Sequence, residues 1–312
     1  MFKRTLASLV MFAALFAGSA AQAAECRLAY TAKIHYAPQI LALQKGWFDT
    51  ADTKVVGVDL GMSAGIAAAE ALVSGSADVA VMGDVPALFA LASARPCVLV
   101  ASYGGGEGMH SLVVSQQSGI TSPKGLEGKK IGVHFGSSTH GAISLYLKAH
   151  GLLDSVKLVN IKQSALVEAL ITGDIDALAA SEPSPSLALR KVAGTTRLAT
   201  LGGLGNDYPL MMVASKAFAD AHPEAIKALI AGTRKGVDYI NSDPASAGTE
   251  LSKVTGVSAQ LEQDTLRKLD WQVRLNEPIL ASLEQTAAFL HSIGRLKKIP
   301  DVRAAVLSDS IR

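Results

Sequence analysis

Short runs of apolar residues alternate along this chain with longer stretches in which apolar residues recur every three or four positions. The short runs predict buried strands, and the longer stretches predict helices packed on a sheet. In the first third of the chain we expect strands at 27–31, 54–60, 79–82 and 98–103, with helices between them. Because strands and helices alternate, the pattern predicts an α/β fold with mostly parallel sheets covered on both faces.

The alternation starts again after a glycine-rich stretch at 104–108. Residues 70–78 read EALVSGSAD and residues 168–176 read EALITGDID, so the pattern EALxxGxxD occurs once in each half. We interpret this repeat as two similar lobes. The same register places Asp84 opposite Glu182, each beyond the carboxyl end of its strand, where ligands of open α/β sheets bind. Both carboxylates are expected to face the space between the lobes, although either also suits the first turn of a helix.

The remaining segments define the expected domains. An apolar run at 210–213 would return the chain to the first lobe, and helices are predicted after it, including a short one following Pro300. We therefore divide the chain into a leader, a first-lobe segment, a second lobe, and a return segment with extra C-terminal helices. Their bounds are 1–23, 24–106, 107–207 and 208–312. The glycine-rich stretch and residues 204–209 are the expected hinge.

The first residues are typical of a cleaved secretory signal. Lys3 and Arg4 precede the apolar run 6–16, and Ala21-Gln22-Ala23 fits an A-x-A cleavage site. We expect a periplasmic protein beginning at Ala24. A lipid-anchored cysteine follows small residues, and Glu25 before Cys26 does not fit that pattern. No later apolar stretch reaches the length of a membrane helix.

Composition narrows the function classes. The chain has 312 residues, a net charge of +2 and 49% hydrophobic residues, enough for a large core. It has no basic run of the kind that nucleic-acid binding requires. The two cysteines, Cys26 and Cys97, could pair in an oxidising compartment. Their strands are expected to lie three positions apart, beyond disulfide reach, which argues against a bridge without settling the matter.

A turn in the second half is the first candidate for ligand binding. Residues 131–133 form a short apolar strand, 136–140 read GSSTH, and a helix is expected from Ala142. Because the first N–H groups of a helix have no partner within it, Ser137, Ser138 and Thr139 can cap them or leave them free for an oxyanion. A plain helix cap is an equally good interpretation of this motif alone.

Taken together, several motifs resemble the substrate-binding proteins of ATP-binding-cassette (ABC) importers, in the group that serves nitrate, aliphatic sulfonates and taurine. The resemblance covers most of the chain after residue 23, in order and spacing. It is carried by HYAP at 35–38, QKGWF at 44–48, GDVP at 83–86, SGI at 118–120, LEGKKIGV at 126–133, GSSTH at 136–140, EP at 182–183 and AHPE at 221–224.

This resemblance implies a two-lobed periplasmic-binding-protein fold of type II, which closes on a small molecule and then docks on a membrane permease. It implies a monomer with no cofactor, no metal and no enzymatic activity. The ligand would be a small organic anion or zwitterion, such as a sulfonate or taurine, although no Arg or Lys clearly enters the expected pocket; a pyrimidine-type ligand is the alternative. By family analogy the pocket residues are Thr31, His35, Tyr36, Ser63, Ala64, Gly83, Asp84, Gly136, Ser137, Ser138, Thr139, His140 and Glu182.

Three other functions fit parts of the sequence. Residues 61–65 match G-x-S-x-G between a strand and a helix, which would make Ser63 a hydrolase nucleophile, but no Asp and His follow in the expected places. Metal binding could use His35, His110, His134 and His140 with Asp84, Glu107 and Glu182, although none of these histidines have helical spacing. A ligand sensor with the same fold cannot be separated from a transport protein on sequence.

Overall fold

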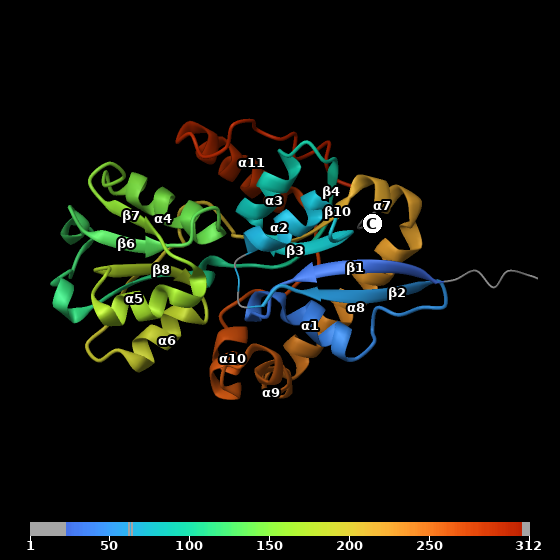
Figure 1. Ribbon diagram of the computed structural model, residues 1–312, viewed down its shortest axis with the longest axis horizontal. Coiled ribbons are helices and arrows are strands. Elements are labelled where there is room, and N and C mark those ends of the chain that lie inside the picture. The colour runs from blue at the N-terminus through green and yellow to red at the C-terminus, as the bar shows by residue number, and fades with distance from the viewer. Residues whose placement is uncertain (1–22, 62, 64, 308–312) are drawn as a thin grey trace, which may run out of the picture.

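The computed structural model describes residues 23–61, 63 and 65–307, which form two lobes, each built on a five-stranded sheet (Figure 1). The first sheet has the strand order β2-β1-β3-β10-β4, and the second has the order β7-β6-β8-β5-β9. The strands of the first sheet are β1 (Ala24–Tyr30), β2 (Thr53–Asp59), β3 (Val79–Gly83), β4 (Cys97–Gly104) and β10 (Leu210–Ser215). Those of the second sheet are β5 (His110–Val114), β6 (Lys130–Val133), β7 (Lys157–Asn160), β8 (Ala177–Ser181) and β9 (Thr196–Thr200).

Each sheet contains one strand that runs against its neighbours. In the first sheet β10 pairs antiparallel with β3 and β4, and in the second β5 pairs antiparallel with β8 and β9. The other pairings, β1 with β2 and β3 and β6 with β7 and β8, are parallel. Both antiparallel strands are the first that the chain forms after crossing between lobes. The mostly parallel, two-lobed α/β fold predicted from the sequence is confirmed.

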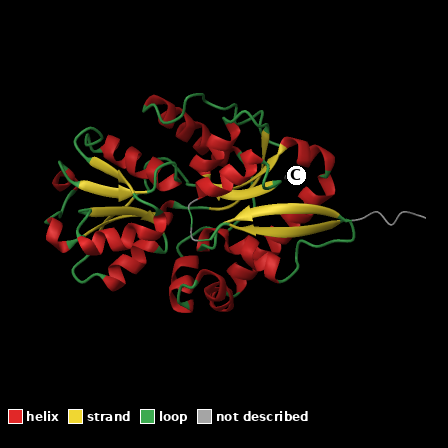
Figure 2. Ribbon diagram, in the orientation of Figure 1, coloured by secondary structure: helices red, strands yellow, loops and turns green. Residues whose placement is uncertain are grey.

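Helices cover both faces of each sheet (Figure 2). They are α1 (Ala37–Gln44), α2 (Gly65–Ser74), α3 (Asp84–Leu91), α4 (Ser138–Ala149), α5 (Leu166–Thr172), α6 (Ser184–Lys191), α7 (Lys216–Ala221), α8 (Pro223–Ser242), α9 (Pro244–Thr255), α10 (Ala259–Leu266) and α11 (Glu277–Ser292). Short 3₁₀ turns lie at 34–36, 107–109, 116–118, 123–126 and 163–165. Figure 1 shows α11 on one side of the junction between the lobes and α10 on the other, so C-terminal helices flank the junction on two sides.

The sequence repeat has a structural counterpart in each lobe. Asp78 accepts a hydrogen bond from the backbone N–H of Arg27 at 3.0 Å, and Asp176 accepts one from the backbone N–H of Lys130 at 2.8 Å. Each aspartate thus fixes the start of its own strand to a neighbouring parallel strand, β1 in the first lobe and β6 in the second. Gly75 and Gly173 follow α2 and α5 with φ of 86° and 79°, a left-handed conformation that favours glycine at the end of a helix. The repeat encodes the same helix-to-strand turn twice.

The C-terminal end corrects one expectation. The short helix predicted after Pro300 is wrong, because Leu99 N donates to Ala305 O at 2.7 Å and Leu307 N donates to Leu99 O at 3.0 Å. These bonds attach the segment to β4 as an isolated parallel bridge between Leu99 and Val306. Pairing with an available strand edge has overridden the local helical pattern.

Two further expectations concern the ends and the cysteines. The predicted signal lies in residues 1–22, outside the described residues apart from Ala23. Cys26 in β1 and Cys97 in β4 are separated by β3 and β10, and neither forms a disulfide.

Among the described residues no helix combines the length and apolar character needed to cross a bilayer. The domain bounds drawn from the sequence stay a prediction.

Candidate functional site

A small cavity of about 30 Å³ lies between the lobes, at the carboxyl ends of β1, β3 and β8. A volume of this size holds about two water molecules, or a few atoms of a ligand. Its lining comes from both lobes: Lys33, His35, Tyr36, Gly65, Gly83, Pro86 and Leu210 from the first, and Met109, His110, Ser137, Ser138, Thr139, Gln163 and Ser181 from the second.

Lys33 supplies a positive charge to this cavity, which corrects the expectation that no Arg or Lys enters it. The side chain is only 5% exposed, and Nζ donates to Ser181 Oγ of the other lobe at 3.2 Å. None of the described carboxylates forms an ion pair with it. Burial lowers the pKa of Lys33 to about 8, so the ammonium form still dominates at neutral pH.

The sequence does not single out Lys33, although it lies in the loop between Thr31 and His35, two residues that are predicted for the site. Lysine is among the residues that are almost never fully buried without a partner, and sequence does not show which way a loop side chain points. The signal that could have found it is its position: the loop after the first strand of an open sheet meets the ligand side of that sheet.

Two histidines face the same region with one ring nitrogen each unpartnered. His35 and His110 are 3% and 2% exposed, and the Nε2 atoms of both have no hydrogen-bond partner. Burial, together with Lys33, lowers the pKa of His110 to about 3 and holds that of His35 well below its usual value, so both rings are neutral. Thr139 Oγ1 lies 2.9 Å from His110 Nδ1. When that hydroxyl donates, Nε2 carries a hydrogen that an oxyanion can accept.

The helix expected from Ala142 begins earlier, at Ser138, so the turn before α4 ends at Ser137, which caps the helix. Ser137 Oγ accepts from His140 N at 3.2 Å and donates to His134 O at 2.6 Å. His140 is not among the lining residues: its ring stacks on Phe135 with centroids 4.4 Å apart, and Gly136 N donates to its Nδ1 at 3.3 Å. The cap residue Ser137 and the first-turn residues Ser138 and Thr139 line the cavity.

The structure thus brings together about half of the predicted site residues. Those that line the cavity are His35, Tyr36, Gly83, Ser137, Ser138 and Thr139. Those that do not are Thr31, Ser63, Asp84, Gly136, His140 and Glu182. Ala64 lies outside the described residues. His110 lines the cavity but is not predicted for the pocket. It begins β5, two residues before the apolar run in the sequence, and because its side chain is polar the apolar pattern does not include it.

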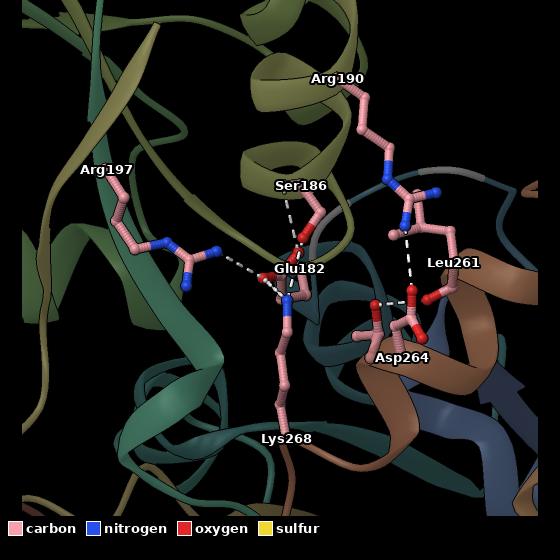
Figure 3. Close-up of polar contacts among 8 residues, drawn as sticks. Glu182, Ser186, Arg190, Arg197, Leu261, Asp264 and Lys268 are labelled. Carbon is pink, nitrogen blue, oxygen red and sulfur yellow. Dashed lines mark hydrogen bonds and ion pairs between the residues drawn. The ribbon is translucent and has the colours of Figure 1, made fainter.

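Glu182 is fully buried but is engaged by the chain itself (Figure 3). Its Oε1 accepts from Lys268 Nζ at 2.8 Å and from Arg197 at 3.2 Å, and its Oε2 accepts from Ser186 N at 3.3 Å. Lys268 follows α10 of the first lobe, whereas the other groups belong to the second. Beside this cluster, Arg190 of α6 pairs with Asp264 of α10 at 3.0 Å. The carboxylate therefore joins the lobes and has two cationic partners.

Asp84 is the counterpart of Glu182 in the first lobe and has different partners. The side chain is 1% exposed; Oδ1 accepts from Val85 N at 2.8 Å and Oδ2 from Asn206 Nδ2 at 3.2 Å. Asn206 belongs to the segment that leads back to the first lobe. Burial raises the pKa of this carboxyl. In the described chain Asp84 forms no ion pair with a cationic side chain.

The geometry does not support the two alternative functions, hydrolysis at Ser63 and metal binding. Ser63 Oγ donates to the backbone oxygen of Leu60 at 3.1 Å, whereas a hydrolase nucleophile would contact a histidine. Within the described ranges, no three His, Cys, Asp or Glu side chains gather closely enough to hold a metal ion.

The sequence and the fold are similar to those of several known proteins. Residues 33–247 match the family described as NMT1/THI5 like. The taurine-binding periplasmic protein of Escherichia coli K12 is 28% identical over 254 residues, covering 75% of this chain and 77% of that protein. The solved alkanesulfonate-binding protein of Xanthomonas axonopodis pv. citri, bound to MOPS, superposes with a TM-score of 0.82 at 24% identity, over 92% of this chain and 99% of that one.

A third comparison widens the range of ligands on this fold. The periplasmic nitrate-binding protein of Synechocystis PCC 6803 superposes with a TM-score of 0.73 at 15% identity, covering 91% of this chain and 85% of that one. At these identities the solved structures show a shared fold and leave the ligand open. The relatives named here are binding proteins, as the sequence predicts for this chain, and not enzymes.

Proposed function

The chain belongs to the NMT1/THI5-like family, and from that premise we propose that it is the extracytoplasmic solute-binding component of an ABC importer. It captures a small organic anion, with a sulfonate as the head group, in the periplasm and delivers it to a membrane permease. The relatives named for taurine and alkanesulfonates support this choice of ligand class, and the site geometry supports it independently.

Lys33 is the observation that carries the proposal. A buried ammonium is unfavourable unless an opposite charge compensates it, and the described chain supplies no carboxylate to Lys33. An anionic ligand would provide that charge. The unpartnered Nε2 atoms of His35 and His110 are further polar groups that a ligand oxygen can satisfy.

The same contacts explain why capture would close the protein. Lys33 and His35 come from the first lobe, whereas His110 and the first turn of α4 come from the second. An oxyanion that contacts both sets is bound fully only when the lobes meet, so ligand binding stabilises the closed form by mass action. The crossovers between β4 and β5 and between β9 and β10 are the segments expected to bend. The closed form is then the one that a permease would recognise.

The direct test is isothermal titration calorimetry of the chain from Ala24 with methanesulfonate, taurine, nitrate, a hydroxymethylpyrimidine and an amino acid. The proposal requires one of the sulfonates to bind and the pyrimidine and amino acid to leave no heat signal. Binding of the pyrimidine alone would replace the proposal with the pyrimidine alternative. Genes for a permease and an ATPase beside this one would favour transport over sensing.

A further inference from the structure

A second cavity, of about 210 Å³, lies between the lobes next to the first. Its apolar lining comes from Val85, Ala142, Leu145, Leu204 and Phe289, and its polar lining from Asp84, Ser138, Asn206, Gln285 and Thr286, with Gly141 and Gly205 completing the wall. The mixture of a short apolar surface and a few polar groups is typical of a site for a small organic molecule.

The two cavities are adjacent, because the same two segments line both. Gly83 lines the first cavity, and the next two residues, Asp84 and Val85, line the second. On the other lobe, Ser138 lines both. Gly83 and Ser138 lie in contact where the two linings meet: a Cβ placed on Gly83 would lie 2.2 Å from Ser138 Oγ and 3.3 Å from Ser138 Cβ. A ligand whose head lies beside Lys33 and whose far end lies in the second cavity would therefore pass this contact.

The two cavities carry opposite charges, and neither Lys33 nor Asp84 forms an ion pair with a described side chain. Lys33 is a buried cation without a described anionic partner, and Asp84 is a buried carboxylate held by two neutral donors. The repeat makes the contrast informative, because the matching residue of the second lobe, Glu182, has Lys268 and Arg197 as cationic partners (Figure 3). Of the two equivalent acids, only Asp84 is left for a cation from outside.

We propose that the second cavity receives the far end of the ligand and that Asp84 selects a ligand whose far end carries an amino group. The inference rests on the proposed function, since the anionic head is bound at Lys33. A single zwitterion then supplies the charge that each cavity lacks. The ammonium also counters the effect of burial, which raises the pKa of Asp84, because a nearby cation favours the carboxylate form. A simple alkanesulfonate would leave Asp84 uncompensated.

The test compares two ligands of the same size, taurine and 1-propanesulfonate, in which a methyl group replaces the ammonium. We expect the wild-type chain to bind taurine about 10- to 100-fold more tightly, the range for a hydrogen bond to a charged group. Asp84→Asn should remove this preference by weakening taurine, with 1-propanesulfonate affected by less than threefold by the same reasoning. Equal affinity of the wild-type chain for both ligands, or equal weakening of both by Asp84→Asn, overturns the inference and leaves the proposed function intact.

A second pair of variants decides the matter if Asp84→Asn does not fold. Leu145→Trp fills the second cavity from α4, and Ala149→Trp puts the same side chain on the exposed end of that helix as a control. Leu145→Trp should weaken taurine at least tenfold while methanesulfonate, which ends in the first cavity, keeps its affinity. Unchanged taurine binding by Leu145→Trp contradicts the inference. If no sulfonate binds the wild-type chain, the proposed function fails and the inference falls with it.

Discussion

Lys268 Nζ donates to Glu182 Oε1 at 2.8 Å, although the two residues are 86 positions apart in the chain. The hydrogen bond joins the two lobes. The carboxylate is fully buried, whereas the lysine side chain is about one third exposed. Arg197 of the second lobe contacts the same oxygen. The acid that the sequence predicts at the ligand site thus takes part in a contact between the lobes.

Replacing Lys268 by Met should therefore lower the free energy of unfolding. We expect a loss of about 1–3 kcal/mol, the usual range for a hydrogen bond to a charged group, with Arg197 preventing the larger loss seen when a buried charge is left unpaired. Urea unfolding followed by circular dichroism measures it. Asp264→Asn is the control, because its pair with Arg190 is exposed and should contribute less than about 1 kcal/mol. Equal losses for the two variants would contradict the special role of Glu182.

Replacing Lys33 by Met should abolish most of the affinity for sulfonates. The variant keeps the length of the side chain and removes the charge, so the loss is expected to reach about 3 kcal/mol, or more than 100-fold in Kd. The fold should be retained or stabilised, because a buried cation is replaced by an apolar side chain. Lys33→Arg, which keeps the charge, is the control. Titration calorimetry gives both affinities, and unchanged binding by the Met variant would remove the main support for an anionic ligand.

The sequence predicted the fold more completely than the site, and the reason is physical. Strands and helices follow from the spacing of apolar residues, and the EALxxGxxD repeat carries its own hydrogen bonds at Asp78 and Asp176. The site depends on contacts between residues distant in sequence. Spacing alone cannot show that Glu182 meets Lys268, that Asp84 meets Asn206, or that Lys33 turns inward to Ser181.

Glu262 should make the stability of the first lobe depend on pH. It is fully buried, Thr255 donates to its Oε1, and its Oε2 has no partner. Burial raises the pKa of the carboxyl from 4.5 to about 7 in the folded chain. The folded state therefore binds an extra proton between these values, and the contribution of this group to stability is greatest below pH 4.5 and falls as the pH rises to about 7.

The measurement is the free energy of unfolding of the wild-type chain and of Glu262→Gln at several pH values. Gln is neutral throughout, so it should gain up to about 3 kcal/mol relative to the wild type between pH 4.5 and 7.5, at 1.36 kcal/mol per pKa unit. Using the difference between the two proteins removes the contribution of the other titrating groups. A difference that stays constant over this range would show that the pKa of Glu262 is ordinary.

Gly83→Ala should weaken ligand binding by hindering closure while leaving the first lobe folded. Gly83 has a φ of −78°, which any residue adopts, so the backbone accepts alanine. The added Cβ would approach Ser138 Oγ of the other lobe to 2.2 Å, far inside contact distance. Either the serine side chain rotates or the lobes stay apart, at a cost of about 1–3 kcal/mol, which is about 5- to 150-fold in the Kd for taurine.

A double-mutant cycle separates this clash from other effects. In a Ser138→Ala background the hydroxyl is absent and the new Cβ meets only the Cβ of residue 138 at 3.3 Å, a much milder approach. Gly83→Ala should then weaken taurine by less than threefold relative to Ser138→Ala alone, so the two substitutions are non-additive. If Gly83→Ala has the same effect in both backgrounds, the loss arises within the first lobe. The clash between the new Cβ and the Ser138 hydroxyl would then not be the cause of weaker binding, because removing the hydroxyl would not have reduced the effect of Gly83→Ala.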